Sequence, residues 1–132
     1  GLFMKKLIYL SLCLLVSITT FAQTQKNEYA KSRKMLQLLM DGKGKELYMM
    51  LDTNAQKAVS AEQLNTLWSE LTQLYGTCNG EGNWETTTLM EQEIQYIDLK
   101  FSSTPLRFLT AFDKDGRANT LRFIPAPVTP TK

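Results

Sequence analysis

The sequence predicts an α+β domain in which three N-terminal helices pack on one face of a four-stranded antiparallel sheet. Up to Gly76 the apolar residues recur with a period of about 3.6 residues, as on a helix, and beyond it they alternate with polar residues, as on a strand. Short turn signals separate the alternating stretches, which indicates consecutive strands joined as hairpins. A helix face this apolar needs a partner surface, and the sheet supplies it.

Three helices are expected before the period changes. The first covers residues 25–41 and ends where Gly42 and Gly44 follow, and the second runs from residue 45 to about residue 52. The third begins after Ser60, whose side chain is expected to form a capping box with Gln63. This third helix carries the longest apolar stripe of the chain: Leu64, Leu67, Trp68, Leu71, Leu74 and Tyr75.

Four strands are expected next, over residues 84–90, 96–101, 106–113 and 118–124. The sequence "DKDG", Asp113 to Gly116, predicts a hairpin turn between the last two. Pairing is expected to stop at Pro125, because proline lacks the amide donor. The domain is therefore expected to span residues 23–127, followed by a flexible tail over residues 128–132.

The first 22 residues have the composition of a secretory signal peptide. Two lysines follow Met4, an apolar run covers residues 7–18, and Thr20-Phe21-Ala22 precedes the expected cleavage site. A transmembrane anchor is the competing interpretation, but the run is shorter than the roughly 20 apolar residues that a bilayer needs. The junction after Ala22 resembles those of proteins exported by Bacteroidetes. We therefore expect an exported protein, periplasmic or extracellular, with no stable membrane span after cleavage.

Cleavage would leave a chain with no net charge. Loss of Lys5 and Lys6 reduces the 15 basic residues to 13, the number of acidic residues. No nucleic acid partner is therefore expected from net charge. Cys78 would remain as a single cysteine, which excludes an intramolecular disulfide. We expect Cys78 to serve as a small buried apolar residue. The alternatives are a disulfide between two chains or a reactive thiol.

The chain contains no histidine. This removes the usual general base near neutral pH, the Ser-His-Asp arrangement and the commonest zinc ligand. No catalytic residue, metal or cofactor is expected. Glu91 and Glu93 have the spacing of paired carboxylates on a strand, but a solvated strand face explains them better. Asp113 and Asp115 before a glycine suggest calcium, but a hairpin turn explains them better because the other ligands of a calcium loop do not follow.

Four aromatic residues with a polar edge are the candidate ligand-binding residues: Trp68, Tyr75, Trp84 and Tyr96. Such side chains suit a cavity that holds an organic ligand. The alternative is that Trp68 and Tyr75, which lie on the helix stripe, pack against the sheet as part of the core. In a helix-on-sheet fold one helix can do both.

Three stretches carry a resemblance to a known family: "LLMDGKGKELYMMLD" at 38–52, "LNTLWSELTQLYG" at 64–76 and "TAFDKDGRANTLRFIP" at 110–125. Over residues 29–127 the chain resembles the domain of unknown function 3887, a member of the nuclear-transport-factor-2-like, cystatin-like superfamily. The resemblance implies a cone-shaped α+β fold with a curved sheet around the helices, often with a cavity at the wide end. Its motifs are structural rather than catalytic.

Three functions from different classes follow. The first is a non-catalytic exported domain that binds a small apolar or peptide-like ligand or a protein partner. The second is a structural or interaction domain that forms a homodimer through the sheet. The third is a lyase- or isomerase-like enzyme that uses Asp98 with a tyrosine, because the resemblance implies relatives with an Asp/Tyr or Asp/His pair in the cone.

Overall fold

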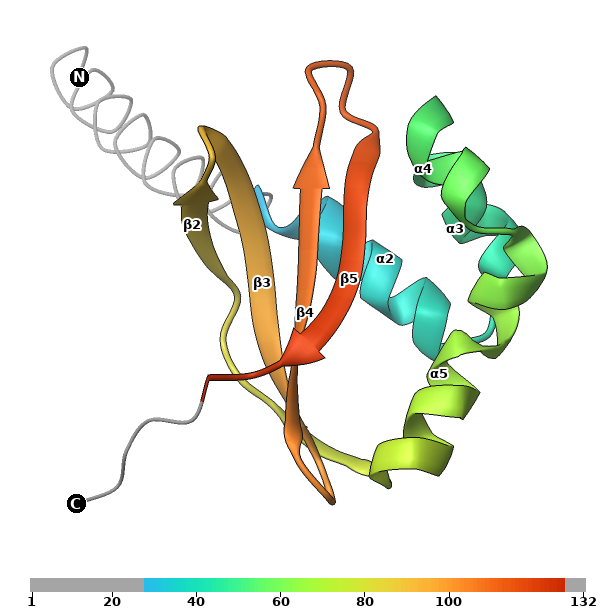
Figure 1. Ribbon diagram of the computed structural model, residues 1–132, viewed down its shortest axis with the longest axis vertical. Coiled ribbons are helices and arrows are strands. Elements are labelled where there is room, and N and C mark those ends of the chain that lie inside the picture. The colour runs from blue at the N-terminus through green and yellow to red at the C-terminus, as the bar shows by residue number, and fades with distance from the viewer. Residues whose placement is uncertain (1–27, 128–132) are drawn as a thin grey trace, which may run out of the picture. The chain divides into compact units, whose positions relative to one another are not determined.

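Four helices precede the sheet in residues 28–127, the part of the chain that the computed structural model describes (Figure 1). They are α2 (Ala30–Met40), α3 (Gly44–Met50), α4 (Thr53–Ala58) and α5 (Ala61–Tyr75). The expected signal peptide, the cleavage site and the tail over residues 128–132 lie outside the described residues. No helix within the described part is long and apolar enough to cross a membrane. Within the described residues, the chain forms one compact unit from Ser32 onward.

The fourth helix, α4, was not predicted, and the prediction of a helix to about residue 52 was wrong at that end. Helix α3 stops at Met50 because Leu51 takes an extended conformation. Asp52 then caps α4 by accepting a hydrogen bond from the Ala55 N–H at 2.8 Å. The α4 sequence "TNAQKA" has no apolar stripe and no fully buried residue, so periodicity could not reveal it.

The predicted boundaries of α5 are confirmed. The Ser60 N–H donates to Gln63 Oε1 at 2.8 Å, and the Gln63 N–H donates to Ser60 Oγ at 3.1 Å. At the other end Gly76 has φ +87°, in the region that favours glycine, and its N–H donates to the Thr72 carbonyl at 2.9 Å. Helix α5 thus has a defined start and end on either side of its apolar stripe.

In the described part of the chain the sheet has five strands rather than four, and it is open. They are β1 (Cys78–Glu81), β2 (Glu85–Leu89), β3 (Gln92–Phe101), β4 (Pro105–Phe112) and β5 (Ala118–Pro125). All pairs are antiparallel, in the order β1-β3-β4-β5, and β2 also pairs with β3. Strand β1 was missed because its sequence "CNGE" shows no β pattern. It is a strand through its pairing with β3.

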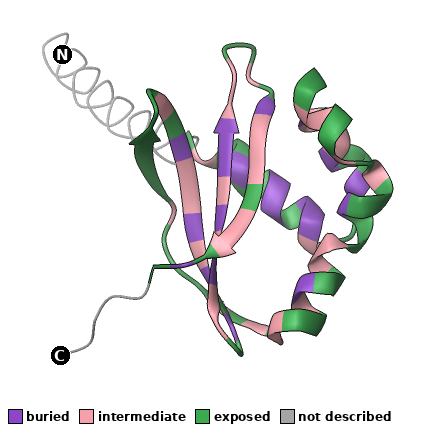
Figure 2. Cartoon of the chain, in the orientation of Figure 1, coloured by how far each residue is buried: buried purple, intermediate pink, exposed green. Residues whose placement is uncertain are grey.

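Alternation along the strands separates the helix-facing side of the sheet from the other side. Ile97 pairs with Phe108 and Leu99 with Leu106, and all four are buried together with Leu39 of α2 (Figure 2). The neighbouring pairs, from Tyr96 and Asp98 on β3 to Leu109 and Arg107 on β4, point to the opposite face. The core therefore lies between this helix-facing side and the helices.

A buried polar cluster ties α2 to the sheet. Ser32 and Thr110 are both completely buried, and their hydroxyl oxygens lie 2.7 Å apart. The Ser32 hydroxyl also donates to the side-chain oxygen of Gln95. Every polar atom of this cluster that faces the core has a partner, so the three side chains fix the position of α2 over β3 and β4 at little desolvation cost.

Candidate functional site

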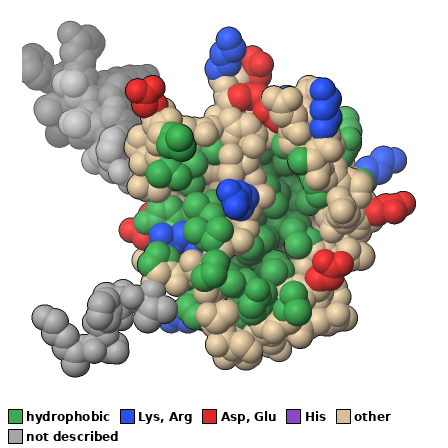
Figure 3. All heavy atoms as spheres, viewed as in Figure 1, with side chains coloured by type: hydrophobic (Ala, Val, Ile, Leu, Met, Phe, Trp, Pro, Cys, Tyr) green, Lys and Arg blue, Asp and Glu red, His purple; other side chains and the backbone are tan. Residues whose placement is uncertain are grey.

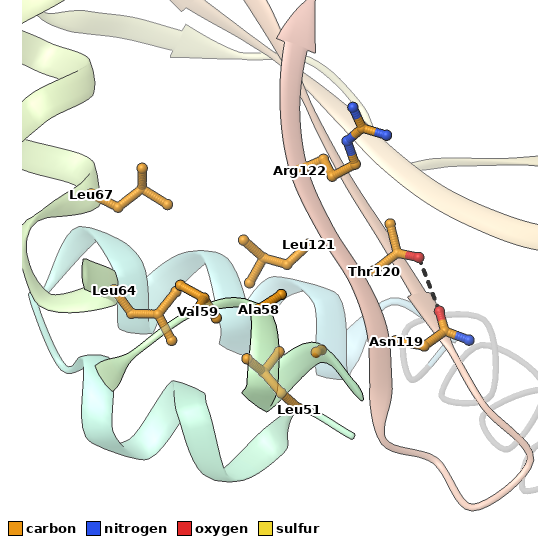
Figure 4. Close-up of a pocket in the computed structure, with 10 residues that line it drawn as sticks. Leu51, Ala58, Val59, Leu64, Leu67, Asn119, Thr120, Leu121 and Arg122 are labelled. Atoms are coloured by element: carbon orange, nitrogen blue, oxygen red, sulfur yellow. Dashed lines mark hydrogen bonds between the residues drawn. The ribbon is translucent and has the colours of Figure 1, made fainter. Parts of the chain in front are cut away.

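An apolar groove lies between β5 and the helices α4 and α5, with a volume of about 510 Å³ (Figure 4). Its helix side is apolar, whereas on its strand side Leu121 is the one apolar residue among the described residues that line it. Leu121 points from β5 toward the helices, whereas Thr120 and Arg122 project the other way. Figure 3 shows hydrophobic side chains gathered on the face of the molecule between the strands and these helices. The groove is lined by Leu51, Ala55, Ala58, Val59, Leu64, Leu67, Asn119, Thr120, Leu121 and Arg122.

One end of the groove is closed by backbone pairing. Leu51 forms a parallel bridge with Ala118, and the Asp52 N–H donates to the Ala118 carbonyl at 2.8 Å. Arg117 adds a second connection, because its guanidinium donates to the Met49 carbonyl at 3.0 Å, at the carbonyl end of α3. These contacts fix the start of β5 against the loop between α3 and α4.

The helix wall is held in place by a reciprocal pair of hydrogen bonds. The Gln56 side-chain amide donates to the Tyr48 carbonyl at 3.0 Å, and the Tyr48 hydroxyl donates to the Gln56 carbonyl at 3.4 Å. They join α4 to α3, so Ala55 and Ala58 are presented to the groove although no residue of α4 is fully buried. The wall is therefore built before any ligand arrives.

The polar side of the groove is also ordered. Asn119 Oδ1 accepts hydrogen bonds from the Gln92 side-chain amide at 2.9 Å and from the Thr120 hydroxyl at 3.0 Å. Among the described residues that line the groove, Arg122 alone carries a charge. A mostly apolar lining with a few placed polar groups, at a volume between about 300 and 1,000 Å³, is typical of ligand sites.

Three of the four predicted ligand-binding residues lie together, but outside this lining. Trp68 packs between Phe101 and Phe123, with ring centroids 5.4 and 6.5 Å away, and Tyr75 contacts Phe101 at 6.4 Å. Trp84 contacts Phe108 at 6.2 Å, and Phe108 contacts Phe123 at 5.0 Å. These rings form one continuous aromatic row on the helix-facing side of the sheet.

Tyr96, the fourth predicted residue, lies on the opposite face of the sheet. The Arg107 guanidinium stands 4.2 Å above the centre of its ring and makes a two-point ion pair with Asp98, at 2.7 and 3.0 Å. The hydrogen bond to Asp98 is the main reason why the pKa of Arg107 is raised above its usual value. The Asp98 side chain is 38% exposed, so the residue named for an enzyme stands in a half-exposed ion pair.

The other groups considered from the sequence have structural positions. Glu91 lies in the two-residue turn between β2 and β3 at φ +65°, so it does not share a strand face with Glu93. Asp113 Oδ1 accepts from the backbone N–H groups of Asp115 and Arg117, both at 2.9 Å, which confirms the predicted turn. In residues 28–127 no group of three or more acidic or cysteine side chains could hold a metal ion.

A second hollow, of about 420 Å³, lies where the end of α5 meets β1. Trp68 and the half-buried Cys78 line it together with Met40. The Cys78 thiol donates to the Gly80 carbonyl at 3.6 Å, which is a weak local contact. The residue predicted as a small buried hydrophobe is thus only half-buried: Cys78 packs against the core from β1, which is an edge strand.

None of the described residues that line the groove, Leu67, Leu121 and Val59 among them, was predicted as a ligand contact. For Leu67 the signal was in the apolar stripe of α5, of which Leu64 and Leu71 are buried while Leu67 is only partly covered. Leu74 of the same stripe is 72% exposed. The stripe is wider than the core contact, and its Leu67 flank faces the groove.

These features define a small α+β domain with a preformed apolar groove beside one edge of an open sheet. The chain belongs to the family described as Protein of unknown function (DUF3887), which matches residues 32–121. The match covers every described residue that lines the groove except Arg122. No curated protein and no solved structure matches the chain.

Proposed function

We propose that this protein is an exported, non-catalytic binding module that holds a small apolar or peptide-like ligand in the groove beside β5. The single observation that supports this proposal best is the groove itself, whose helix wall is held in place by hydrogen bonds to the surrounding backbone carbonyls. We also propose that the domain belongs to the nuclear-transport-factor-2-like superfamily. Export is supported by the composition of the first 22 residues.

The ligand is expected to be largely apolar. Burying a charged group against Val59, Leu64 and Leu67 would cost several kcal/mol because these side chains cannot solvate it. The side chains of Asn119 and Thr120 already hydrogen-bond to protein partners, so they do not demand a strongly polar ligand.

Leu67→Asp is expected to weaken binding of the hydrophobic dye anilinonaphthalene sulfonate by about tenfold or more, because it places a carboxylate in the groove wall. Leu74→Asp is the matched control, since Leu74 lies on the same flank of α5, two turns further on, and is exposed. The measurement is a fluorescence titration, with circular dichroism to verify that both variants are folded. Equal weakening in both variants, or no saturable binding in the wild type, would contradict the proposal.

Self-association through β2 is a second candidate function, favoured by one specific observation. Strand β2 is exposed along its whole length, and the turn that follows it displays Met90 at 92% exposure. Met90 and Glu91 both have positive φ, at 51° and 65°, which is a strained conformation for two residues other than glycine. An exposed edge strand with a strained apolar tip suits contact with a second copy.

The double substitution Met90→Asn, Glu91→Gly tests this second candidate. Asparagine and glycine are the favoured residues of a two-residue turn with positive φ, so the unfolding free energy is expected to rise by about 1 kcal/mol. If the tip forms a dimer contact, sedimentation equilibrium is expected to show a weaker dimer despite the more stable fold. A wild-type protein that remains monomeric at high concentration would exclude this candidate.

A further inference from the structure

Strand β5 forms the edge of the sheet that borders the groove, and part of its backbone points into the groove. The Ala126 N–H donates to the Pro105 carbonyl at 3.0 Å, toward β4. Successive residues of a strand direct their N–H and C=O groups to opposite sides, and the register is regular from Thr120 to Pro125. The backbone groups of Leu121 and Phe123 therefore face away from β4. Pro125 is another residue of β5 at which the backbone N–H position faces away from β4, so the N–H that proline lacks is not needed for pairing with β4.

The same edge already pairs with another segment at its first residue. Leu51 lies parallel to Ala118, and the Asp52 N–H donates to the Ala118 carbonyl. Asp52 then turns away as the cap of α4. Within residues 28–127 this bridge is the only pairing on the outer side of β5. Beyond Ala118 the outer edge of β5, which borders the groove, is therefore available for pairing with another strand.

The residues that line the groove determine which segment can pair with this edge of β5. Side chains of an added strand would alternate between the helix side, where Val59, Leu64 and Leu67 lie, and the other face, toward which Arg122 projects. The β5 residues that line the groove run from Asn119 to Arg122, which is room for a paired segment of about four residues. Of the lining residues that the structure describes, none is acidic and the one that is charged, Arg122, is positive.

From these contacts we propose that the free edge of β5 captures an extended segment of another protein. The segment adds as a strand, places apolar side chains at alternate positions against α4 and α5, and carries an acidic side chain toward Arg122. This inference rests on the proposed binding function and specifies its ligand as a peptide. Main-chain hydrogen bonds to Leu121 and Phe123 provide affinity, and the apolar walls provide selectivity.

The test uses the whole protein and a short fluorescein-labelled peptide with valine at alternate positions and one glutamate between them. Two further peptides carry N-methyl groups on one or the other alternate set of backbone nitrogens. Only one set can donate to β5, so one methylated peptide is expected to bind about tenfold more weakly or worse, and the other like the parent. Fluorescence polarisation measures all three.

A charge exchange tests the role of Arg122. Arg122→Glu is expected to weaken binding of the glutamate peptide and to strengthen binding of a peptide with lysine in place of the glutamate, because the pairing of charges is reversed. If Arg122 had only a structural role, the substitution would change the affinity for both peptides in the same direction. Such parallel changes would overturn the assignment of the acidic position.

The outcomes separate this inference from the proposed function. If both methylated peptides bind like the parent, or if the dye binds and no peptide does, strand addition is wrong and the groove remains a site for small apolar ligands. If neither dye nor peptide binds saturably, both proposals are wrong. Unequal binding of the two methylated peptides supports strand addition, since a purely hydrophobic contact would not distinguish them.

Discussion

Gly44→Ala is expected to lower the free energy of unfolding by about 3 kcal/mol, because α3 and α5 approach each other too closely at this point for a methyl group. A Cβ atom at Gly44 would lie 2.2 Å from the Ala61 carbonyl oxygen and 2.5 Å from the Asn65 backbone nitrogen. Both are backbone atoms, so relief requires a shift of a whole helix. The Gly44 N–H also donates to Asn65 Oδ1 at 2.6 Å, and that bond would be lost with the shift.

Gly80→Ala is the matched control for this substitution. A Cβ atom there would lie 3.6 Å from Lys100 Cδ, an ordinary contact with a flexible side chain, so stability is expected to change by less than about 0.5 kcal/mol. Urea unfolding followed by circular dichroism measures both variants. If Gly44→Ala is as stable as Gly80→Ala, the two helices do not meet at Gly44. In that case the helix wall of the groove, which α5 supplies, needs revision.

The long periodic elements could be predicted because each encodes its own boundaries. Helix α5 begins at a capping box and ends at a glycine with positive φ, and both signals lie within its own sequence. Strands β3, β4 and β5 alternate strongly enough to identify their buried face. Helix α4 and strand β1 have no such internal signal. They exist because Asp52 caps a short turn and because β3 offers a partner to residues 78–81.

The candidate site depends on distances between elements, which periodicity does not contain. The sequence identified Leu64 as part of the apolar stripe of α5, but whether that stripe meets β5 or leaves a groove beside it depends on how α5 lies across the sheet. The position of Tyr96 could have been deduced, because the same alternation that buries Ile97 directs Tyr96 to the opposite face. The preference for aromatic residues as ligand contacts outweighed that signal. The groove found in the structure is aliphatic.

Phe108→Ala is expected to have the largest effect on stability, about 4 kcal/mol. Phe108 is completely buried at the centre of the sheet, and its ring contacts Trp84 at 6.2 Å and Phe123 at 5.0 Å. Removing it leaves a cavity and breaks the aromatic row between these two residues. A loss of this size approaches the whole stability of a small domain, so the variant is expected to be partly unfolded at 37 °C.

Leu109→Ala, one residue further along β4, separates the loss of this ring from any general sensitivity of the strand. Leu109 pairs with Tyr96 on the face away from the helices and is only partly buried, so its truncation is expected to cost about 1 kcal/mol. Thermal unfolding followed by tryptophan fluorescence should show a much lower midpoint for Phe108→Ala than for Leu109→Ala. Since a shift of one residue in register would exchange the two faces, the reverse order would mean that β4 presents Leu109 to the helices. Leu121, which lies opposite Thr110 on the next strand, would then point away from the groove, and the binding site proposed here would lose its strand wall.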